Sequence, residues 1–456
     1  MQYIKSMNIT EVAHFESLYP AESRQGEIEK VLGYITQGQS CQVLGLPGVG
    51  QSTFLKLLAY NRNVRIKHLG DKQSTYHFVL VNLSEVRTRP LVEVTKFIFL
   101  SLVDSLRERG LIDEHESIVK IFKESVAISD ELVMFQGLKQ ALDFLMLEKD
   151  LTIVLLLDRF EEYIPMLTEG FFANLRTLRN RGKHKFSVVA SLNRSLEESV
   201  EPALTREFGE YISNNVVYLS LVEKVILEFR IKQIEKLSRK TLTDSQKEQL
   251  FSLTGGFGRL MKNCARLILN QEKDLPADIA VFLLSQQSIQ KPLIDIWEAL
   301  TPSEQDFLLS NDNYESFDVD YPYLEKIGLL KNNKIAIPLL QNYIRQELGE
   351  REKIEEKQPI VYFSDTNEIK KGTDLISDRL TSLEFKLLKF LLHRPDMLVD
   401  RDAIVGAVWS DAASVAGVTE QALDQLLFRL RKKIEEDPNT PKHLKTVKGR
   451  GIRFTP

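Results

Sequence analysis

The chain is poor in cysteine, because only Cys41 and Cys264 occur among its 456 residues, and both stand in apolar runs. Two thiols are too few for a disulfide framework or a cysteine-based metal cluster, so we interpret both as small buried side chains. No apolar run approaches the ~18 residues that a membrane helix needs, and the first residues lack the apolar centre of a signal peptide. These absences predict a soluble, cytoplasmic protein.

A strong net charge is also absent. The chain has 60 Lys and Arg residues against 64 Asp and Glu residues, which leaves a net charge of −4. Contacts with nucleic acid must therefore come from a local basic surface and not from the field of the whole molecule. The length suggests about three domains on a prior of ~150 residues each. No repeat period of ~20 to 50 residues is apparent, which argues against a solenoid.

One stretch has three glycines at short spacing, Gly-Leu-Pro-Gly-Val-Gly-Gln-Ser-Thr at residues 45–53. This stretch matches the phosphate-binding pattern G-x-x-x-x-G-K-[ST], except that Gln51 stands at the lysine position. A short apolar strand is predicted before it at 41–46, and a helix is predicted after it at 52–59. Backbone N–H groups between a strand and a helix start can surround an anion. The stretch therefore predicts a phosphate-binding loop with one altered residue.

In such a loop the lysine provides charge for the β- and γ-phosphates, and the hydroxyl group at Ser52 holds magnesium. Glutamine keeps a hydrogen-bond donor but lacks the charge. The alternatives are a glycine-rich turn without a ligand, and a fold that has lost strong nucleotide binding or hydrolysis. The phosphate-binding interpretation assigns the cofactor contacts to Gly45, Pro47, Gly48, Gly50, Gln51, Ser52 and Thr53.

Apolar runs and helical patterns alternate along the first half of the chain. The strand-like runs lie at 76–83, 151–158, 186–191 and 216–219, and helical periodicity is found at 22–35, 91–109 and 132–148. This alternation indicates a parallel sheet with helices on both faces. Ligands of such sheets bind at the carboxyl ends of the strands, and the loop at 45–53 and Asp158 both fall at this edge.

Residues ~20 to 285 resemble an AAA+ ATPase of the origin-recognition or STAND kind. The resemblance rests on the loop at 45–53, Asp158 at a strand end, Asn193 after the next strand, and a Gly-Gly-x-x-Arg turn that ends in Arg259. It implies ATP or ADP and Mg²⁺ as cofactors, with Ser52 and Asp158 as metal ligands. It also implies that Asn193 lies near the γ-phosphate and that Arg259 reaches the nucleotide from a helical lid.

The acid that activates water in these ATPases usually follows the strand-end acid directly. Here Arg159 follows Asp158, which leaves that catalytic role to Glu161 or Glu162 at an altered position, or to no residue. Gln51 removes a charge that stabilises the transferred phosphoryl group, and Arg159 displaces the water-positioning acid. We therefore expect weak or absent ATP hydrolysis.

The C-terminal segment resembles the OmpR/PhoB-type winged-helix DNA-binding domain. The matching features are a Leu-Thr-x-x-Glu-Phe-x-Leu-Leu pattern from Leu380, the pair Val408-Trp409, a long helix at 418–434 and a hairpin at 446–454. The resemblance implies double-stranded DNA as the partner, with the long helix in the major groove. A winged helix that serves only protein contact remains the alternative.

A local basic surface accompanies this resemblance, because nine Lys and Arg residues stand against three acidic residues between Arg429 and Arg453. Such a cluster is suited to phosphate contacts. Outward positions near the start of the long helix are predicted to hold Gln421, Gln425 and Leu426, and glutamine can pair with adenine through two hydrogen bonds. The predicted DNA contacts are Gln421, Gln425, Arg429, Arg431, Lys432, Lys445, Lys448 and Arg450, with Arg450 in the minor groove.

These observations predict a multidomain α/β protein, with an AAA+-like parallel sheet and a helical lid followed by two winged-helix domains. The predicted ranges are a core at 1–220, a lid at 221–290, a structural winged helix at 291–350, a linker at 351–366 and the DNA-binding domain at 367–456.

Our leading hypothesis is a nucleotide-responsive transcriptional regulator that binds DNA. The alternatives are an ATP-hydrolysing signalling or defence assembly that uses the winged helix for placement, and a non-enzymatic scaffold. A homo-oligomer is possible if Arg176, Arg179 and Arg181 reach a neighbouring subunit, although a solvated helix face is the more common use of such residues.

Overall fold

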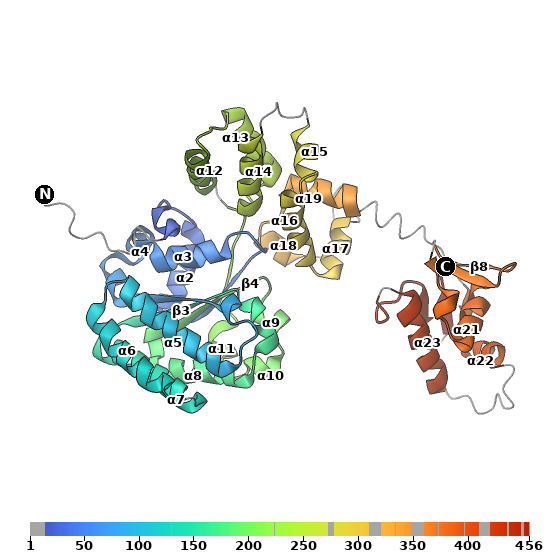
Figure 1. The fold of residues 1–456 in the computed structure, drawn as a ribbon, viewed down its shortest axis with the longest axis horizontal. Helices are drawn as coiled ribbons and strands as arrows, with labels where there is room; N and C mark the ends of the chain where they lie inside the picture. The colour runs from blue at the N-terminus through green and yellow to red at the C-terminus, as the bar shows by residue number, and fades with distance from the viewer. Residues whose placement is uncertain are drawn as a thin grey trace. The chain divides into compact units, whose positions relative to one another are not determined.

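The structure of the chain is a computed structural model that describes residues 14–128, 130–222, 224–271, 278–309, 321–332, 334–348, 360–372, 374–395, 397–409, 420–435, 437–447 and 451–455. The chain divides into two compact units, Met1–Ile344 and Arg345–Pro456. Figure 1 gives the element labels that are used below. In the described parts of the chain, no helix is long and apolar enough to cross a bilayer.

The first unit is built on a five-stranded parallel sheet with the strand order β2-β3-β4-β1-β5. Both faces of the sheet are covered, because every residue of β4 is buried although alternate side chains point to opposite faces. This confirms the predicted sheet. The strands are β1 (Cys41–Leu44), β2 (Tyr76–Asn82), β3 (Thr152–Asp158), β4 (Phe186–Leu192) and β5 (Val216–Tyr218).

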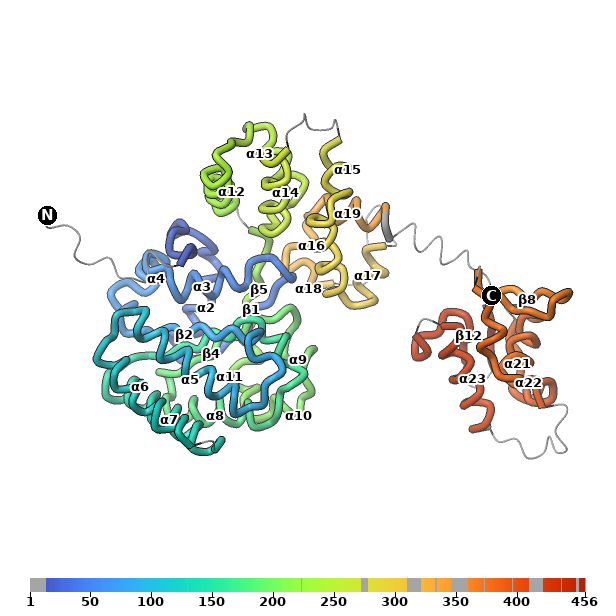
Figure 2. The backbone as a smooth tube through the Cα atoms, viewed as in Figure 1, coloured from blue at the N-terminus to red at the C-terminus, as the bar shows by residue number. Residues whose placement is uncertain are grey.

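The helices of the sheet bury one apolar face each. Helix α2 (Gln25–Thr36) buries Ile28, Val31, Leu32 and Ile35, which is the periodicity expected from the sequence. Helix α6 (Ile112–Val126) was not predicted, and it packs between α5 (Leu91–Glu108) and α7 (Glu131–Asp143). Figure 2 shows this three-helix layer in cyan. The other long helices are α3 (Gln51–Tyr60), α4 (Arg62–Leu69) and α8 (Glu169–Gly182).

Three helices form the predicted lid: α12 (Lys224–Ser238), α13 (Asp244–Thr254) and α14 (Gly258–Asn270). Helix α13 begins with a capping box between Thr243 and Gln246. The turn into α14 requires glycine, because Gly255 has φ 56° and a Cβ there would lie 1.7 Å from the backbone oxygen of Ala336.

A smaller module completes the first unit. It contains α15 (Ile279–Leu284), α16 (Gln287–Glu298), α17 (Pro302–Leu309), α18 (Pro322–Lys326), the hairpin of β6 (Leu330–Lys331) and β7 (Lys334–Ile335), and α19 (Pro338–Tyr343). Helix α18 is short, because Gly328 turns the chain at φ 73° and Leu330 already pairs in β6. Arg194, in the loop after β4, reaches this module through an ion pair with Glu304 and lies 3.7 Å from the ring centroid of Tyr323.

The described residues of the second unit have their own core and form three α-helices: α21 (Ser382–Leu392), α22 (Arg401–Val408) and α23 (Glu420–Ile434). Strands β12 (Leu444–Val447) and β13 (Gly451–Phe454) form the predicted terminal hairpin, and β11 (Leu398–Val399) pairs with β13. Three helices followed by a hairpin are the winged-helix arrangement that the sequence predicted.

An additional antiparallel sheet precedes these helices. It consists of β8 (Ile360–Phe363), β9 (Glu368–Lys371) and β10 (Asp374–Leu375). Strand β8 falls inside the range 351–366 that was predicted as a linker, so the linker was predicted to end too late. Ile360 and Ile369 belong to the core of the second unit, which explains why this sheet folds with the helices.

Candidate functional site

One cavity of the first unit collects most of the predicted site residues. It measures about 670 Å³ and opens at the carboxyl ends of the strands, beside the lid. Its wall is formed by Pro47, Gly48, Gly50, Gln51, Ser52, Thr53, Asp158, Arg159, Glu161, Glu162, Ser191, Asn193, Arg230, Arg259, Lys262 and Asp295. Segments far apart in the sequence therefore meet at one place, as expected for the ligand-binding edge of a parallel sheet.

The glycine-rich loop has the backbone of an anion-binding turn. Gly48 and Gly50 have φ values of 91° and 112°, and α3 begins directly after Gly50. Among the described residues, no atom beyond Gly50 and its two chain neighbours lies within 4 Å of the position that a Cβ on Gly50 would take, so the backbone is open to a ligand there. Gly45 lies outside the cavity wall, where a Cβ would approach Val49 and Leu219. The role of Gly45 is therefore to let the loop pack closely on the sheet.

A hydroxyl group and a carboxylate meet at the bottom of the cavity. The Ser52 hydroxyl donates to Asp158 Oδ1 at 3.0 Å, and the Ser191 hydroxyl donates to the same oxygen at 3.2 Å. Mg²⁺ in nucleotide sites is commonly held by one or two protein oxygens together with phosphate and water. Within the described residues no cluster of three or more His, Cys, Asp or Glu side chains exists that could hold a metal ion alone. Ser52 and Asp158 thus fit a metal that arrives with a phosphate ligand.

The side chain of Gln51 is directed to the protein itself. Its Nε2 donates to the backbone oxygen of Leu192 at 2.6 Å, at the end of β4. The neighbouring Asn193 lines the cavity, and its Oδ1 is buried without a hydrogen-bond partner among the described residues. A buried amide oxygen without a partner is costly, so it marks a place where a ligand or water would bind.

The two candidate catalytic acids differ in their surroundings. Glu162 accepts a hydrogen bond from Arg159 at 2.9 Å, and Arg159 occupies the left-handed region at φ 54°. Glu161 has a buried Oε2 without a partner among the described residues. Burial, together with the nearby charges of Asp158 and Glu162, raises the pKa of Glu161 to about 7. Of the two acids, Glu161 therefore has the environment of a general base.

The lid contributes positively charged side chains to the wall of the same cavity. Arg259 Nη1 donates to Asp295 Oδ2 at 2.6 Å, and Arg230 Nη2 donates to the hydroxyl group of Thr53 at 3.3 Å. Lys262 also lines the cavity, one turn after Arg259 in α14. Of these residues only Arg259 was predicted. The sequence gives no pattern for Arg230, whereas the spacing of Arg259 and Lys262 on one helix face was a usable signal.

A small apolar pocket of about 20 Å³ adjoins the cavity and shares Gly50, Thr53 and Arg230 with it. Tyr19, Leu57 and Ile226 form a buried cluster beside this pocket. The pocket was not predicted, because its walls come from the N-terminal segment, α3 and α12. A volume of about 20 Å³ holds little more than one water molecule, so the pocket is too small for a nucleobase.

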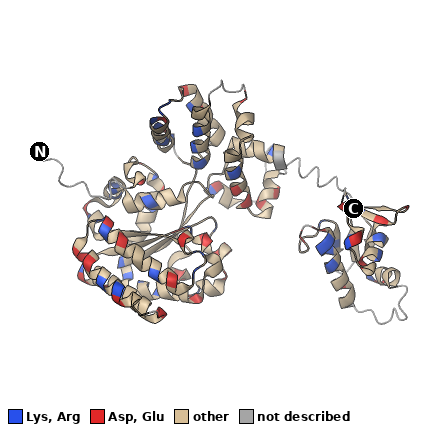
Figure 3. Cartoon of the chain, in the orientation of Figure 1, with Lys and Arg blue, Asp and Glu red and all other residues tan. Residues whose placement is uncertain are grey.

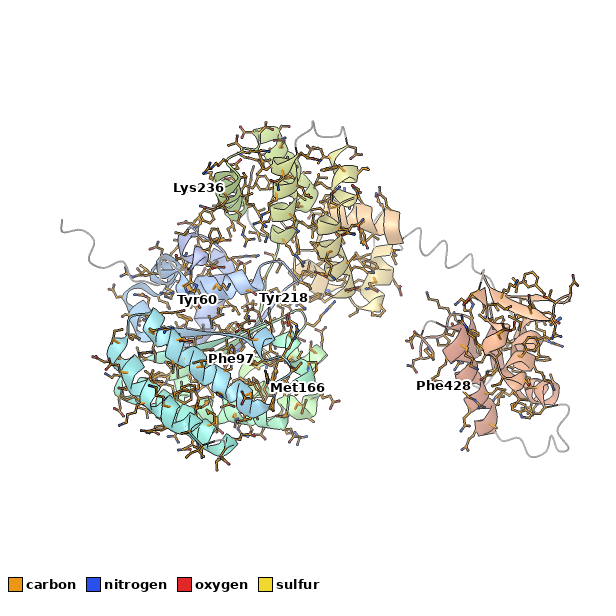
Figure 4. All side chains as sticks on the ribbon, in the orientation of Figure 1. Tyr60, Phe97, Met166, Tyr218, Lys236 and Phe428 are labelled. Carbon is orange, nitrogen blue, oxygen red and sulfur yellow. The ribbon has the colours of Figure 1, made fainter. Side chains whose placement is uncertain are left out.

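The predicted DNA contacts in the second unit lie on α23 and β12, except for Lys448 and Arg450, which are outside the described residues. Gln421, Gln425, Arg429, Lys432 and Lys445 are exposed. Figure 3 shows basic residues along α23. Figure 4 labels Phe428 on the same helix, and its side chain is 42% exposed.

One prediction on α23 needs correction. Leu426 was expected to point outward, but it is 1% exposed and packs in the core, because it continues the apolar face that Leu423, Leu427 and Leu430 form. The guanidinium of Arg431, a predicted DNA contact, donates to the backbone oxygen of Leu444 at 2.9 Å and to the hydroxyl group of Thr446 at 2.7 Å. The contact of Arg431 with DNA stays a prediction.

The match to a known protein family lies in this second unit. Residues 378–454 match the family described as "Transcriptional regulatory protein, C terminal". The sensory transduction protein RegX3 of Mycolicibacterium smegmatis is 41% identical over 71 residues, which are 16% of this chain and 30% of the relative. The chain thus spans less than half the length of the curated relatives it matches.

Two solved structures are also similar. The RstA DNA-binding domain of Klebsiella pneumoniae, in complex with the RstA box, is 23% identical and has a TM-score of 0.19, and the match covers 21% of this chain and 91% of that domain. A Walker-type ATPase of Pyrococcus abyssi is 11% identical with a TM-score of 0.42, over 71% of this chain and 95% of that protein. Residues 378–454 are a domain of the transcriptional regulatory family named above, on a chain whose first unit is a parallel sheet with a glycine-rich loop.

Proposed function

We propose that the chain is a nucleotide-responsive transcriptional regulator that binds DNA through its second unit and hydrolyses ATP weakly or not at all. The observation that carries the nucleotide half is the contact between Ser52 and Asp158 at 3.0 Å, inside the cavity that the glycine-rich loop lines. A serine at the start of a helix and an acid at the end of a strand are the pair that positions magnesium beside a phosphate chain.

The remaining parts of the cavity match the phosphate end of a nucleotide. The open backbone at Gly50 suits phosphate oxygens. The unpartnered Oδ1 of Asn193 suits a water molecule or a hydroxyl group near the terminal phosphate. ATP or ADP with Mg²⁺ is therefore the proposed ligand.

Weak hydrolysis follows from the two altered positions. Gln51 has no positive charge, and its amide already donates to Leu192. Stabilisation of charge on the transferred phosphoryl group provides most of the catalysis in such sites. Without the loop lysine, the site retains the groups for binding but has lost a group that acts in the transition state.

The DNA half of the proposal rests on the family match of residues 378–454 and on the exposed residues of α23 and β12. Gln421 and Gln425 project from the N-terminal half of α23, which is the part of a recognition helix that reads base edges. Arg429, Lys432 and Lys445 are proposed to contact phosphates. Lys448 and Arg450 remain proposed contacts on sequence grounds.

The nucleotide proposal is tested by ligand content and affinity. Purified chain is denatured, released nucleotide is identified by chromatography, and ATP and ADP are then titrated with Mg²⁺ against wild type and Gln51→Lys. Bound nucleotide or micromolar affinity in wild type supports the proposal. It fails if wild type binds nothing and Gln51→Lys restores binding, since the cavity would then be a relic.

A second function is favoured by one observation, the raised pKa of Glu161, which is about 7. A buried acid with that pKa can accept a proton from water at neutral pH. This supports an ATP-hydrolysing signalling or defence assembly that uses the winged helix for placement on DNA. Magnesium-dependent release of phosphate by wild type, absent in both Asp158→Asn and Glu161→Gln, would establish this function. Undetectable turnover together with intact DNA binding would exclude it.

A further inference from the structure

We propose that two lid residues, Arg230 of α12 and Lys262 of α14, bind the phosphate chain in place of the lysine that the glycine-rich loop lacks. The ligand class is a nucleoside di- or triphosphate. The proposal rests on the proposed function, because it requires that a nucleotide binds in the 670 Å³ cavity. It adds two binding residues to that site and makes the lid the source of its positive charge.

The first support is position. Arg230 and Lys262 both line the cavity that Ser52 and Asp158 also line. Arg230 already reaches the loop helix, because its Nη2 lies 3.3 Å from the hydroxyl oxygen of Thr53. Thr53 is in the first turn of α3, where the N–H groups of a phosphate site point. A phosphate bound at this helix start would therefore be within reach of the guanidinium.

The second support is the lack of a countercharge for Arg230 and Lys262 among the residues that the structure describes. Arg259, by contrast, forms an ion pair with Asp295, and Asp295 forms a second ion pair with Lys291. The hydrogen-bond partners of Arg230 are the uncharged hydroxyl groups of Tyr19 and Thr53.

Lys262 forms no ion pair with any residue that the structure describes. Burial lowers its pKa, and so do the like charges of Arg266, Arg230 and Arg259. An anion among these cations would relieve their repulsion.

The third support is the distribution of charge across the cavity. Asp158, Glu161 and Glu162 come from the end of β3 and the turn after it, and the one cation among them, Arg159, is paired with Glu162. Arg230 and Lys262 come from the lid, and the nearby acid Asp295 is paired with Arg259. A phosphate chain with a magnesium ion needs this arrangement, because the metal faces carboxylates and the phosphate oxygens face cations. Gln51 cannot supply the positive wall, since it is uncharged and donates to Leu192.

The test is a titration of Mg–ATP and Mg–ADP against the full chain and single variants. Arg230→Met and Lys262→Met should each weaken binding by about tenfold to a hundredfold, as expected when a charged hydrogen-bond partner of a phosphate is lost. The matched control is Lys232→Met on α12, whose side chain is exposed and outside the cavity wall. This control should bind as wild type.

A rescue separates a binding role from a structural one. Gln51→Lys should restore most of the affinity that Lys262→Met removes, because it returns a cation to the phosphate site without repairing the lid. Lys262→Arg and Arg230→Lys keep the positive charge and should retain nucleotide binding. If these two variants lose binding as well, the loss in the methionine variants is caused by misfolding.

The outcomes distinguish the two proposals. If wild type binds nucleotide and Arg230→Met and Lys262→Met bind equally well, the lid inference is overturned while the proposed function stands. If wild type binds nothing and Gln51→Lys alone creates binding, the proposed function and the lid inference both fail. A loss in the two lid variants with rescue by Gln51→Lys supports both.

Discussion

At the scale of single residues, the cavity has Gln51 at the lysine position of the glycine-rich loop and Arg159 directly after the strand-end acid Asp158. The Gln51 amide donates a hydrogen bond to the backbone oxygen of Leu192, and the Arg159 guanidinium donates one to the carboxylate of Glu162. Glu161 is left as a buried acid with a free oxygen in the described part of the chain. Burying this carboxylate costs free energy, so replacing Glu161 should change the free energy of unfolding by a measurable amount.

We predict that Glu161 destabilises the ligand-free protein above neutral pH. The pKa of this acid is raised from 4.5 to about 7, so between these values the folded chain binds more protons than the unfolded chain. The free energy of unfolding must then fall as pH rises through this window, and the full penalty is present above pH 7. Glu161→Gln should therefore stabilise the first unit at pH 8 by on the order of 1–3 kcal/mol and have little effect at pH 4.5.

The measurement is urea denaturation of the full chain in EDTA at both pH values. Trp297 reports the first unit when Trp409, the other tryptophan, is replaced by phenylalanine. Glu162→Gln serves as control, because that acid is paired with Arg159. Equal stabilisation by Glu161→Gln at both pH values would contradict the assignment of the raised pKa.

At the scale of elements, α23 has a buried face, an exposed polar face and an attachment to the wing. The attachment is Arg431, which binds β12 through two hydrogen bonds. We predict that Arg431→Ala lowers the free energy of unfolding of the second unit by about 1–3 kcal/mol, because two hydrogen bonds from a charged donor are lost. Arg429→Ala, on the exposed face, should change it by less than about 0.5 kcal/mol.

This comparison is read by denaturation with Trp409 as the reporter in a Trp297→Phe background. Trp409 packs against the core of the second unit. If Arg431→Ala and Arg429→Ala both have the denaturation midpoint of wild type, the hydrogen bonds from Arg431 to β12 do not stabilise the second unit.

The exposed face of α23 gives a second prediction at this scale. Gln425→Ala should mainly relax base preference, whereas Lys445→Ala should weaken binding to all sequences and reduce the slope of log K against log salt by about 1. Binding is measured by fluorescence anisotropy on a duplex selected from a random pool and on a scrambled duplex, at several salt concentrations. Identical effects of both variants on both duplexes would contradict the groove assignment.

At the scale of the whole molecule, the proposed function requires communication between a nucleotide site in one unit and a DNA surface in the other. Linkage makes this reciprocal: if nucleotide changes the affinity for DNA by some factor, DNA changes the affinity for nucleotide by the same factor. We predict a change of about fivefold or more in both directions, which is the usual lower range of such coupling.

The reciprocal titrations use the full chain, once for DNA at saturating Mg–ATP, Mg–ADP or no nucleotide, and once for nucleotide at saturating DNA. Lys445→Ala is the control, since it should weaken DNA binding while leaving the coupling factor unchanged. Affinities that are independent of the other ligand in both titrations would favour the scaffold hypothesis.

Much of the fold could be predicted from local pattern. Apolar runs bounded by turns gave the five strands, and the match from Leu380 to the terminal hairpin gave the helices of the second unit. The errors occurred where the pattern is weak. Helix α6 was not predicted, and β8 was assigned to a linker. Leu426 was predicted to be exposed, although the neighbouring side chains bury it.

The sequence by itself determined the loop at 45–53, the strand-end acid Asp158 and the identity of the DNA-binding-type domain, because each depends on residue types at fixed short spacing. Only the tertiary structure decided which distant residues share the cavity. Arg230 and Lys262 lie far from the loop in sequence, and packing of α12 against α14 brings them to its wall. Such convergence depends on how helices pack on one another and on the sheet, and no local pattern specifies it.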